Sequence, residues 1–356
     1  MHLGYSDEHR QFADGLDRFL ARSHSFEERR AQLGAGVASD PALWAQLADM
    51  GCLAMTLPDA LGGLDAEPLL LGLMARALGR HLVAEPVLPA VLAGVWLGAA
   101  AGAQPHAAAL ASGRRRYAVA TGLTEASGFV SGRALGVAGG SCADLVLVPG
   151  VDALHVVEAA QLRSVPVRML DDSIAADLEA EAVPSERLDA GPGWAVAATQ
   201  AARLAALFRG WQALGCLDAA VEATAAYMRD RVQFGRPLGA FQAVQHRVAD
   251  MLVAAKDAEV AALLGALGLS GAARDAERAL AVMTARVMLA AGQVADGAVQ
   301  LHGGMGVSDE LDIAARFRLL QAYRLGADAD GDPVRRYAET VVATGGHLRS
   351  AVLAEV

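Results

Sequence analysis

The sequence predicts an α+β multidomain protein with an N-terminal helical domain, a central β-sheet or barrel domain and a C-terminal four-helix bundle. Three observations support this layout. Apolar residues recur at helical spacing from residue 6 to about residue 113. Short valine- and leucine-rich runs separated by glycine, aspartate and proline follow from residue 114. Helical spacing then returns after residue 190 and continues toward the end of the chain.

The first predicted domain covers residues 1–113. Ser6 followed by Asp7 and Glu8 suits a helix start, because a hydroxyl and early carboxylates complement the free N–H groups there. Two sets of apolar residues each fall on one helical face: Phe12, Leu16, Phe19 and Leu20, then Leu43, Leu47, Met50 and Leu53. A loop at LPDALGGLDAEP, with its proline and paired glycines, separates the helices.

An uncharged stretch from residue 86 to residue 113 has the length of a membrane span. It is rich in alanine and glycine, is broken by Pro89 and Pro105, and contains His106. These features favour a pair of buried helices, so we expect no membrane span.

The second predicted domain covers residues 114–189. Its expected strands are YAVAT (117–121), DLVLVPG (144–150), LHVV (154–157) and SVPVRML (164–170). The third covers residues 190–356 and begins at GPGW. Alanine, leucine and arginine, all strong helix formers, dominate segments at about 195–230, 239–268, 273–301 and 333–354. These segments predict the four-helix bundle.

Composition excludes several classes of protein. With 54% hydrophobic and 20% charged residues among 356, the chain is not disordered. A net charge of −10 repels phosphate backbones and argues against a nucleic-acid binder. Three widely spaced cysteines, Cys52, Cys142 and Cys216, match no metal motif and suggest buried thiols in a reducing compartment. The N-terminus lacks signal-peptide features, so we expect a cytoplasmic protein.

The segment YMRDRVQFGRPLGAFQAVQHRVADM (227–251) is the most informative stretch of the chain. It predicts a helix ending at Gly235, a turn at Pro237 and a second helix. Arg231 and Gln233 lie beside the bend, where the arginine could direct two donors to a diphosphate. Equally, Arg231 could be a solvated residue that complements the C-terminal helix dipole.

A second segment, AVQLHGGMGVSDELDIAARFR (298–318), has a helix stopped by Gly303 and Gly304. Without a Cβ, these residues leave backbone N–H groups open to a ligand. Gln300, one turn earlier, could contact an adenine edge or another amide. The glycine pair could also be an ordinary helix C-cap.

Together these two segments resemble the acyl-CoA dehydrogenase family, through R-x-Q-F-G-x-P-L-x-x-F-Q-x-x-Q-H-x-x-A-D-M and then Q-L-H-G-G-M-G. The order of the three domains agrees. YSDEHRQFADGLDRFL and WAQLADMGCLAMTLPDALGG also look like the family's first domain, particularly its small-subunit type in dicarboxylyl-CoA and steroid-side-chain dehydrogenases.

The resemblance implies an FAD-dependent oxidoreductase acting on CH–CH groups, which converts an acyl-CoA thioester to its trans-2-enoyl form. A glutamate removes the α proton, a hydride leaves the β carbon, and an electron-transfer flavoprotein takes the electrons. The residues that it implies for FAD, partly across a subunit interface, are Arg231, Gln233, Phe234, Phe241, Gln242, Gln300, Gly303 and Gly304. At least a dimer is implied.

The catalytic base of the family has no clear counterpart. Ungapped alignment from Gln300 places that glutamate on Ala327, and the alternative position on an earlier helix falls near Ala205. Asp328 and Asp330 are the nearby candidates, with Asp332, but they also fit a solvated loop.

The middle domain also departs from the family pattern, because the Glu-Pro-x-x-Gly-Ser-Asp run that covers the flavin ring is missing. LTEASG (123–128) is a candidate remnant, with Thr124 and Ser127 as candidate flavin contacts.

Three hypotheses follow. The chain is the base-lacking subunit of a heteromeric acyl-CoA dehydrogenase whose catalytic large subunit supplies the glutamate. Alternatively, it is an active homo-oligomeric dehydrogenase, a homodimer or tetramer with an unorthodox base such as Asp328. In the third, it is a scaffold protein that has lost FAD. The residues do not define the length or shape of the acyl chain.

Overall fold

The computed structural model describes residues 5–271, 276–329, 334–335 and 337–338, which form two compact units. The bundle unit contains the described residues of Met1–Arg22, Pro68–Leu82 and Ala206–Val356. The sheet unit contains Ser23–Glu67 and Val83–Ala205. This grouping by compactness does not test the three predicted domains, 1–113, 114–189 and 190–356, which stay a prediction.

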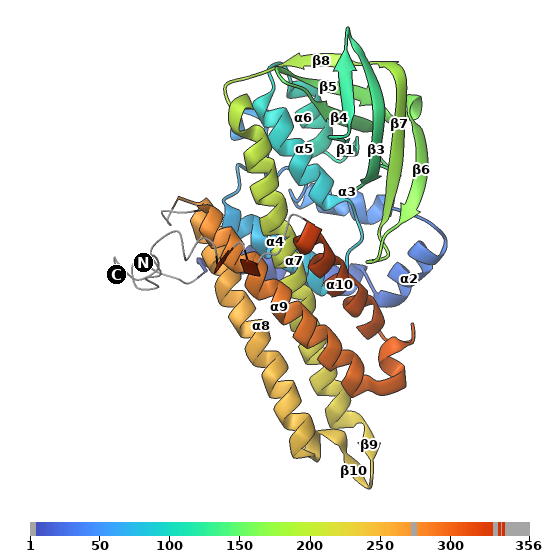
Figure 1. The fold of residues 1–356 in the computed structure, drawn as a ribbon, viewed down its shortest axis with the longest axis vertical. Coiled ribbons are helices and arrows are strands. Elements are labelled where there is room, and N and C mark those ends of the chain that lie inside the picture. The colour runs from blue at the N-terminus through green and yellow to red at the C-terminus, as the bar shows by residue number, and fades with distance from the viewer. Residues whose placement is uncertain (1–4, 272–275, 330–333, 336, 339–356) are drawn as a thin grey trace. The chain divides into compact units, whose positions relative to one another are not determined.

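The helices of the bundle unit are α1 (Asp7–Ser23), α4 (Pro68–Arg80), α7 (Trp194–Asp230, which starts in the sheet unit), α8 (Gln242–Leu269), α9 (Ala276–His302) and α10 (Ile313–Ala329). Within this unit α9 packs along α8 on one side and against α10 on another (Figure 1). Its core includes Trp211, Phe208, Leu214, Met283 and Val294, all nearly inaccessible to solvent. The predicted helices at 195–230, 239–268 and 273–301 are therefore present.

The predicted start of the first helix is confirmed. The Ser6 hydroxyl accepts a hydrogen bond from the His9 backbone N–H at 3.1 Å, and α1 begins at Asp7. Leu16 and Leu20 are fully buried, as the apolar spacing predicts.

Helix α10 (Ile313–Ala329) was not among the helices predicted from the sequence. The predicted helix at 333–354 lies outside the described residues except for 334–335 and 337–338, so it stays a prediction. Arg316 interrupts the apolar pattern of α10 although it is buried. Its guanidinium bonds Asp312 at 2.6 Å and the Arg80 carbonyl at 2.8 Å, which compensates the buried charge.

The sheet unit contains two four-stranded sheets. In the first, the order is β1 (Tyr117–Val119), β4 (Leu145–Pro149), β5 (Ala153–Glu158) and β8 (Glu186–Asp189), with β1 parallel to β4 and the other pairs antiparallel. In the second, the order is β2 (Leu123–Ala126), β3 (Phe129–Val137), β7 (Ile174–Pro184) and β6 (Arg163–Arg168), all antiparallel. An apolar cluster that includes Val130, Val146, Val157 and Leu178 draws on strands of both sheets.

The four predicted strands correspond to β1, β4, β5 and β6, but β2, β3, β7 and β8 were missed. The longest of these, β7, is rich in alanine and acidic residues, which are poor strand formers. The alternative of a barrel is wrong for the described residues, which form two separate sheets rather than a closed one.

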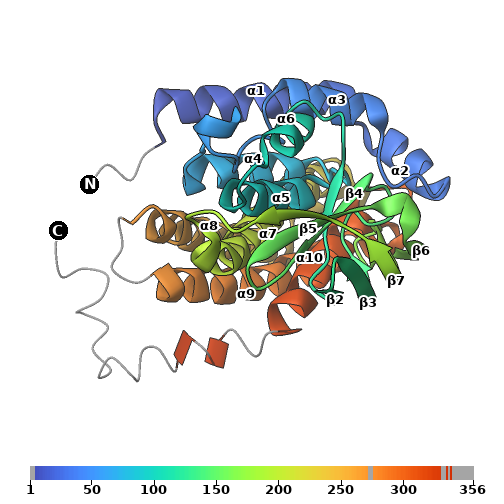
Figure 2. The same cartoon turned by 90° about the horizontal axis from the view of Figure 1, so that it is seen from above.

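The helices of the sheet unit are α2 (Phe26–Gly34), α3 (Pro41–Asp49), α5 (Val87–Ala99) and α6 (Gln104–Ala111). Within this unit α5 contacts both α6 and β1. Figure 2 shows α6 beside α5. The uncharged stretch at 86–113 thus forms a pair of helices, as predicted, but only α5 is largely buried, whereas α6 buries Ala107 and Leu110 and exposes Gln104, Pro105 and Ala108. Among the described residues, only Ala276–Val307 is long and apolar enough to cross a membrane, and it includes α9 of the bundle core.

Candidate functional site

A tight hairpin connects α7 to α8 and carries the first predicted segment. Helix α7 ends at Asp230, not at Gly235 as predicted, and β9 (Val232–Gln233) pairs with β10 (Arg236–Pro237). The two turn residues between them, Phe234 and Gly235, have φ values of 55° and 79°. A two-residue turn with positive φ at both positions suits a hairpin, but it places a phenylalanine in a backbone region that glycine prefers.

The hairpin exposes the side chains that the sequence singles out. Arg231 and Gln233 are exposed, and 88% of Phe234 is accessible to solvent. Phe241, the residue before α8, packs edge-on against Phe234 with ring centroids 6.2 Å apart. The Arg236 guanidinium carbon lies 3.9 Å from the centroid of the Phe241 ring, a cation–π contact.

The second predicted segment forms the end of α9, and the predicted helix stop is confirmed. Helix α9 ends at His302, and Gly303 follows with a φ of 60°. A Cβ built on Gly303 or Gly304 meets no heavy atom within 4 Å, so both backbones are open to solvent. Gln300 is exposed on the last turn of α9.

The ends of α7 and α9 meet through two rings that sequence reasoning did not identify. Tyr227 and His302 stack with centroids 4.4 Å apart and ring planes inclined by 20°. His302 Nδ1 lies 2.9 Å from the Ala298 carbonyl, to which it donates, and burial lowers the pKa of this histidine below 6.5. This stack brings the two predicted segments together. The sequence signal that could have identified the two rings is their position beside the motifs: Tyr227 lies four residues before Arg231, and His302 directly precedes Gly303.

Three polar side chains of these segments are available to a ligand. Arg231, Gln242 and Gln300 form no side-chain hydrogen bond or ion pair with any residue in the described part of the chain. A guanidinium suits a diphosphate, amides suit the edge of a base, and open glycine N–H groups suit either. These residues therefore fit the adenosine diphosphate half of a dinucleotide such as FAD.

A catalytic carboxylate is absent from both positions where the family resemblance places one. Ala327 lies within α10, which continues to Ala329, and Ala205 lies within α7. Asp328 belongs to α10, but its side chain lies outside the described part, and Asp330 and Asp332 lie outside the described residues altogether.

The LTEASG segment forms β2 and the turn to β3 in the sheet unit. Thr124 and Ser127 are exposed, and Ser127 has a φ of 55°. Glu125 accepts a hydrogen bond from the Gly128 N–H at 2.5 Å across this turn.

A buried histidine supports this turn. His155 is 2% exposed, and its Nε2 lies 3.6 Å from a Glu125 carboxylate oxygen. Its Nδ1 lies 3.3 Å from Ser185 Oγ, and that hydroxyl donates to the Gly128 carbonyl at 3.4 Å. The imidazole thus contacts the turn through two routes. Sequence reasoning missed it, because a lone histidine in a strand carries no specific pattern.

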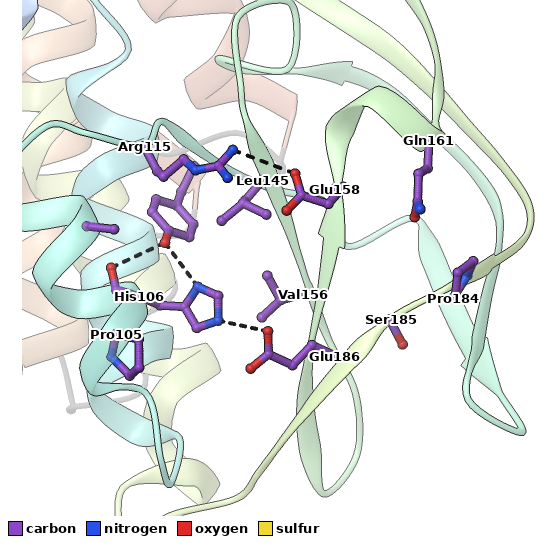
Figure 3. Close-up of a pocket in the computed structure, with 12 residues that line it drawn as sticks. Pro105, His106, Arg115, Leu145, Val156, Glu158, Gln161, Pro184, Ser185 and Glu186 are labelled. Carbon is purple, nitrogen blue, oxygen red and sulfur yellow. Dashed lines mark hydrogen bonds and ion pairs between the residues drawn. The ribbon is translucent and has the colours of Figure 1, made fainter.

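The sheet unit also holds a pocket of about 410 Å³ beside α6 and the first sheet (Figure 3). Its polar walls are paired with one another: Arg115 lies 3.7 Å from Glu158, and His106 lies 3.1 Å from the Tyr117 hydroxyl and 3.2 Å from Glu186. None of the catalytic or cofactor-binding residues predicted from the sequence lines this pocket. Within the described residues no cluster of three or more histidine, cysteine, aspartate or glutamate side chains could hold a metal ion.

The chain matches two family models, the N-terminal domain of acyl-CoA dehydrogenase over residues 6–103 and its C-terminal domain over residues 191–329. The acyl-CoA dehydrogenase IpdE2 of Mycobacterium tuberculosis is 32% identical over 295 residues, which cover 81% of this chain and 83% of the relative.

Two solved structures show the same fold over almost the whole chain. The ChsE4-ChsE5 complex from Mycobacterium tuberculosis contains a chain with a TM-score of 0.84 and 24% identity, covering 96% of this chain and 99% of that one. The Tcur3481-Tcur3483 steroid ACAD variant gives a TM-score of 0.80 and 25% identity, with the same coverage. The models and the relative together show that this chain belongs to the acyl-CoA dehydrogenase family.

Proposed function

We propose that this chain is the base-lacking subunit of a heteromeric, FAD-dependent acyl-CoA dehydrogenase. The observation that carries the proposal is an asymmetry between the residues suited to bind FAD and the missing catalytic base. Side chains suited to the adenosine diphosphate half of FAD are open at the hairpin and at the end of α9. The two positions where the family resemblance expects the catalytic base hold alanines, Ala327 and Ala205, instead of an acidic residue.

The chain's own residues would bind and orient the cofactor. When bound, FAD supplies the two-electron oxidation of the Cα–Cβ bond of an acyl-CoA thioester. Arg231 would bind the diphosphate, and Gln233, Gln242 and Gln300 would contact the base or neighbouring amides. Phe234 and Phe241 would cover the nucleotide from solvent, and Gly303 and Gly304 would offer backbone N–H groups.

A partner subunit would supply the carboxylate that removes the α proton. Apolar side chains exposed near these segments support a partner: Val232 and Phe234 on the hairpin are 54% and 88% exposed, and Leu252 and Val253 on α8 are 48% and 62% exposed. The solved ChsE4-ChsE5 relative is itself a complex of two proteins. We further propose that an electron-transfer flavoprotein accepts the electrons, and that the complex acts in the cytoplasm.

Co-expression with candidate large subunits tests the proposal. We expect the purified complex to contain bound FAD, seen as absorbance near 450 nm, and to lose that absorbance when an acyl-CoA is added. Arg231→Met in this chain should lower the FAD content of the complex. The matched control is Arg286→Met, which removes an exposed arginine from α9, away from both segments, and should leave the FAD content unchanged.

The isolated chain separates the alternatives. Rapid bleaching of flavin by the isolated chain would contradict the base-lacking role and favour an active homo-oligomer. Asp328→Asn would then abolish turnover if Asp328 is the base. A complex or homo-oligomer that never retains FAD would instead favour a scaffold.

A further inference from the structure

We infer that Tyr227 and His302 are positioning residues that hold the two nucleotide-binding segments in register. The identity of the ligand rests on the proposed function, but the structural coupling between the hairpin and the glycine turn does not. The inference names a role for two side chains that contact neither reacting atoms nor, in our assignment, the cofactor.

Tyr227 belongs to the last turn of α7 and therefore controls where the hairpin begins. The Arg231 N–H donates to the Tyr227 carbonyl at 2.8 Å, and this bond attaches the backbone of Arg231 to the last turn of the helix. The Leu238 N–H donates to the Arg231 carbonyl at 2.9 Å and closes the hairpin on the same residue. A shift of Tyr227 thus moves Arg231 and the hairpin with it.

His302 occupies the equivalent place at the end of α9. It is 5% exposed, and its Nδ1–H is bonded to the Ala298 carbonyl, so its ring is held by its own helix. Gly303 turns the chain directly after it with a φ of 60°, and a Cβ on Gly306 would lie 3.1 Å from the His302 Cβ. The imidazole is therefore enclosed by the turn that carries the open glycines.

The ring stack joins two residues that are 75 positions apart in the sequence. Stacking of the two rings, with centroids 4.4 Å apart, restrains both helix ends laterally. Nothing else in the described hairpin ties Arg231 to the glycine turn through side-chain hydrogen bonds. The stack is thus a direct contact between the two halves of the site, in addition to the packing of α8 along α9.

Hydrogen–deuterium exchange on the full chain tests the coupling without a ligand. Tyr227→Leu removes one ring, and we expect faster exchange in residues 303–307 as well as in 231–238. His302→Leu removes the other ring of the stack and should speed exchange in the same two segments. Tyr227→Phe and His302→Phe keep a ring in place and should leave both segments near wild type.

A core variant far from the stack separates positioning from general loss of stability. Leu207 is fully buried on α7, twenty residues before Tyr227, or about 30 Å along the helix. Leu207→Ala should lower Tm without the paired change in exchange. If each ring deletion speeds exchange only in its own segment, or if Leu207→Ala reproduces the paired change, the positioning role is wrong.

The ligand is tested separately with FAD and the co-expressed complex. Tyr227→Leu and His302→Leu should each weaken FAD retention roughly tenfold, whereas Tyr227→Phe should not. Coupled exchange together with a wild-type complex that never holds FAD would overturn the proposed function and leave the coupling intact. Uncoupled exchange in an FAD-loaded complex would overturn the positioning role alone.

Discussion

Arg76 on α4 holds the carboxylate of Asp218 on α7 at 2.7 Å. The same guanidinium bonds Glu259 on α8 at 2.7 Å, so one cation joins three helices of the bundle unit. All three side chains are mostly buried, with exposures of 21%, 12% and 18%. Burial raises the pKa of Asp218, and Arg76 acts in the opposite direction.

Replacing Arg76 with methionine should destabilise the protein strongly. The substitution leaves the buried Asp218 without its cation, whereas Glu259 keeps Lys256 at 2.8 Å. Breaking a buried pair in this way costs about 3–5 kcal/mol. The loss should grow as pH rises, because the pKa of Asp218 would increase further and its ionised form would become the costly one. Urea unfolding at two pH values measures both effects.

Arg286→Met is the matched control for Arg76→Met. Arg286 pairs with Asp257 at 2.9 Å, but both side chains are more than half exposed. Exposed pairs contribute only about 0–1 kcal/mol, so the control should change stability little. Equal losses in the two variants would contradict the view that burial makes the Arg76 cluster important.

Gly215→Ala should also destabilise the bundle. A Cβ on Gly215 would fall on the Arg76 carbonyl oxygen, because α4 and α7 approach closely at this point. The helices must separate to admit a methyl group, at a cost of roughly 3 kcal/mol. Thermal unfolding should show a lower Tm.

Gly15→Ala in α1 serves as the control for Gly215→Ala. A Cβ there meets nothing within 4 Å, and replacing a helical glycine with alanine then gains about 0.5–1 kcal/mol. If Tm rises in Gly15→Ala and falls in Gly215→Ala, the loss of stability in Gly215→Ala comes from the close contact between α4 and α7. A fall in Tm of similar size in both variants would contradict this explanation.

These interactions show where sequence reasoning reached its limit. The periodicity of apolar residues predicted α7, α8 and α9, and the motifs identified Arg231 and the glycine turn, because both signals are local. Gly215 and Arg76 are separated by more than a hundred residues, so their contact depends on how the helices pack. Strand β7 was missed for a related reason, since its alanines become strand residues only when β3 and β6 pair with them.

The stability of the bundle should depend on the protonation of His302. Burial lowers the pKa of this histidine from 6.5, so the folded state prefers the neutral ring. Its stabilising contribution is complete above about pH 6.5 and is lost as pH falls toward the folded pKa, because the unfolded chain then binds the proton more readily.

The comparison of wild type with His302→Phe isolates this effect from the other histidines. Phenylalanine retains a ring against Tyr227 but cannot titrate. Urea unfolding between pH 5 and pH 7.5 should show a steeper loss of stability toward low pH in the wild type. Parallel curves for the two proteins would count against the lowered pKa.

The turn between β2 and β3 should loosen when His155 is replaced by phenylalanine. The variant keeps most of the ring volume but removes Nε2 from Glu125 and Nδ1 from Ser185. Both partners are partly exposed and keep a hydrogen bond to Gly128, so we expect only the loss of a typical hydrogen bond, about 0.5–1.5 kcal/mol. Exchange of backbone amides in residues 123–131 should become faster. Thr124→Val is the control: the Thr124 hydroxyl donates only a 3.4 Å bond from an exposed position, so exchange should stay close to wild type. Unchanged exchange in His155→Phe would mean that the Glu125–Gly128 hydrogen bond maintains the turn without the histidine.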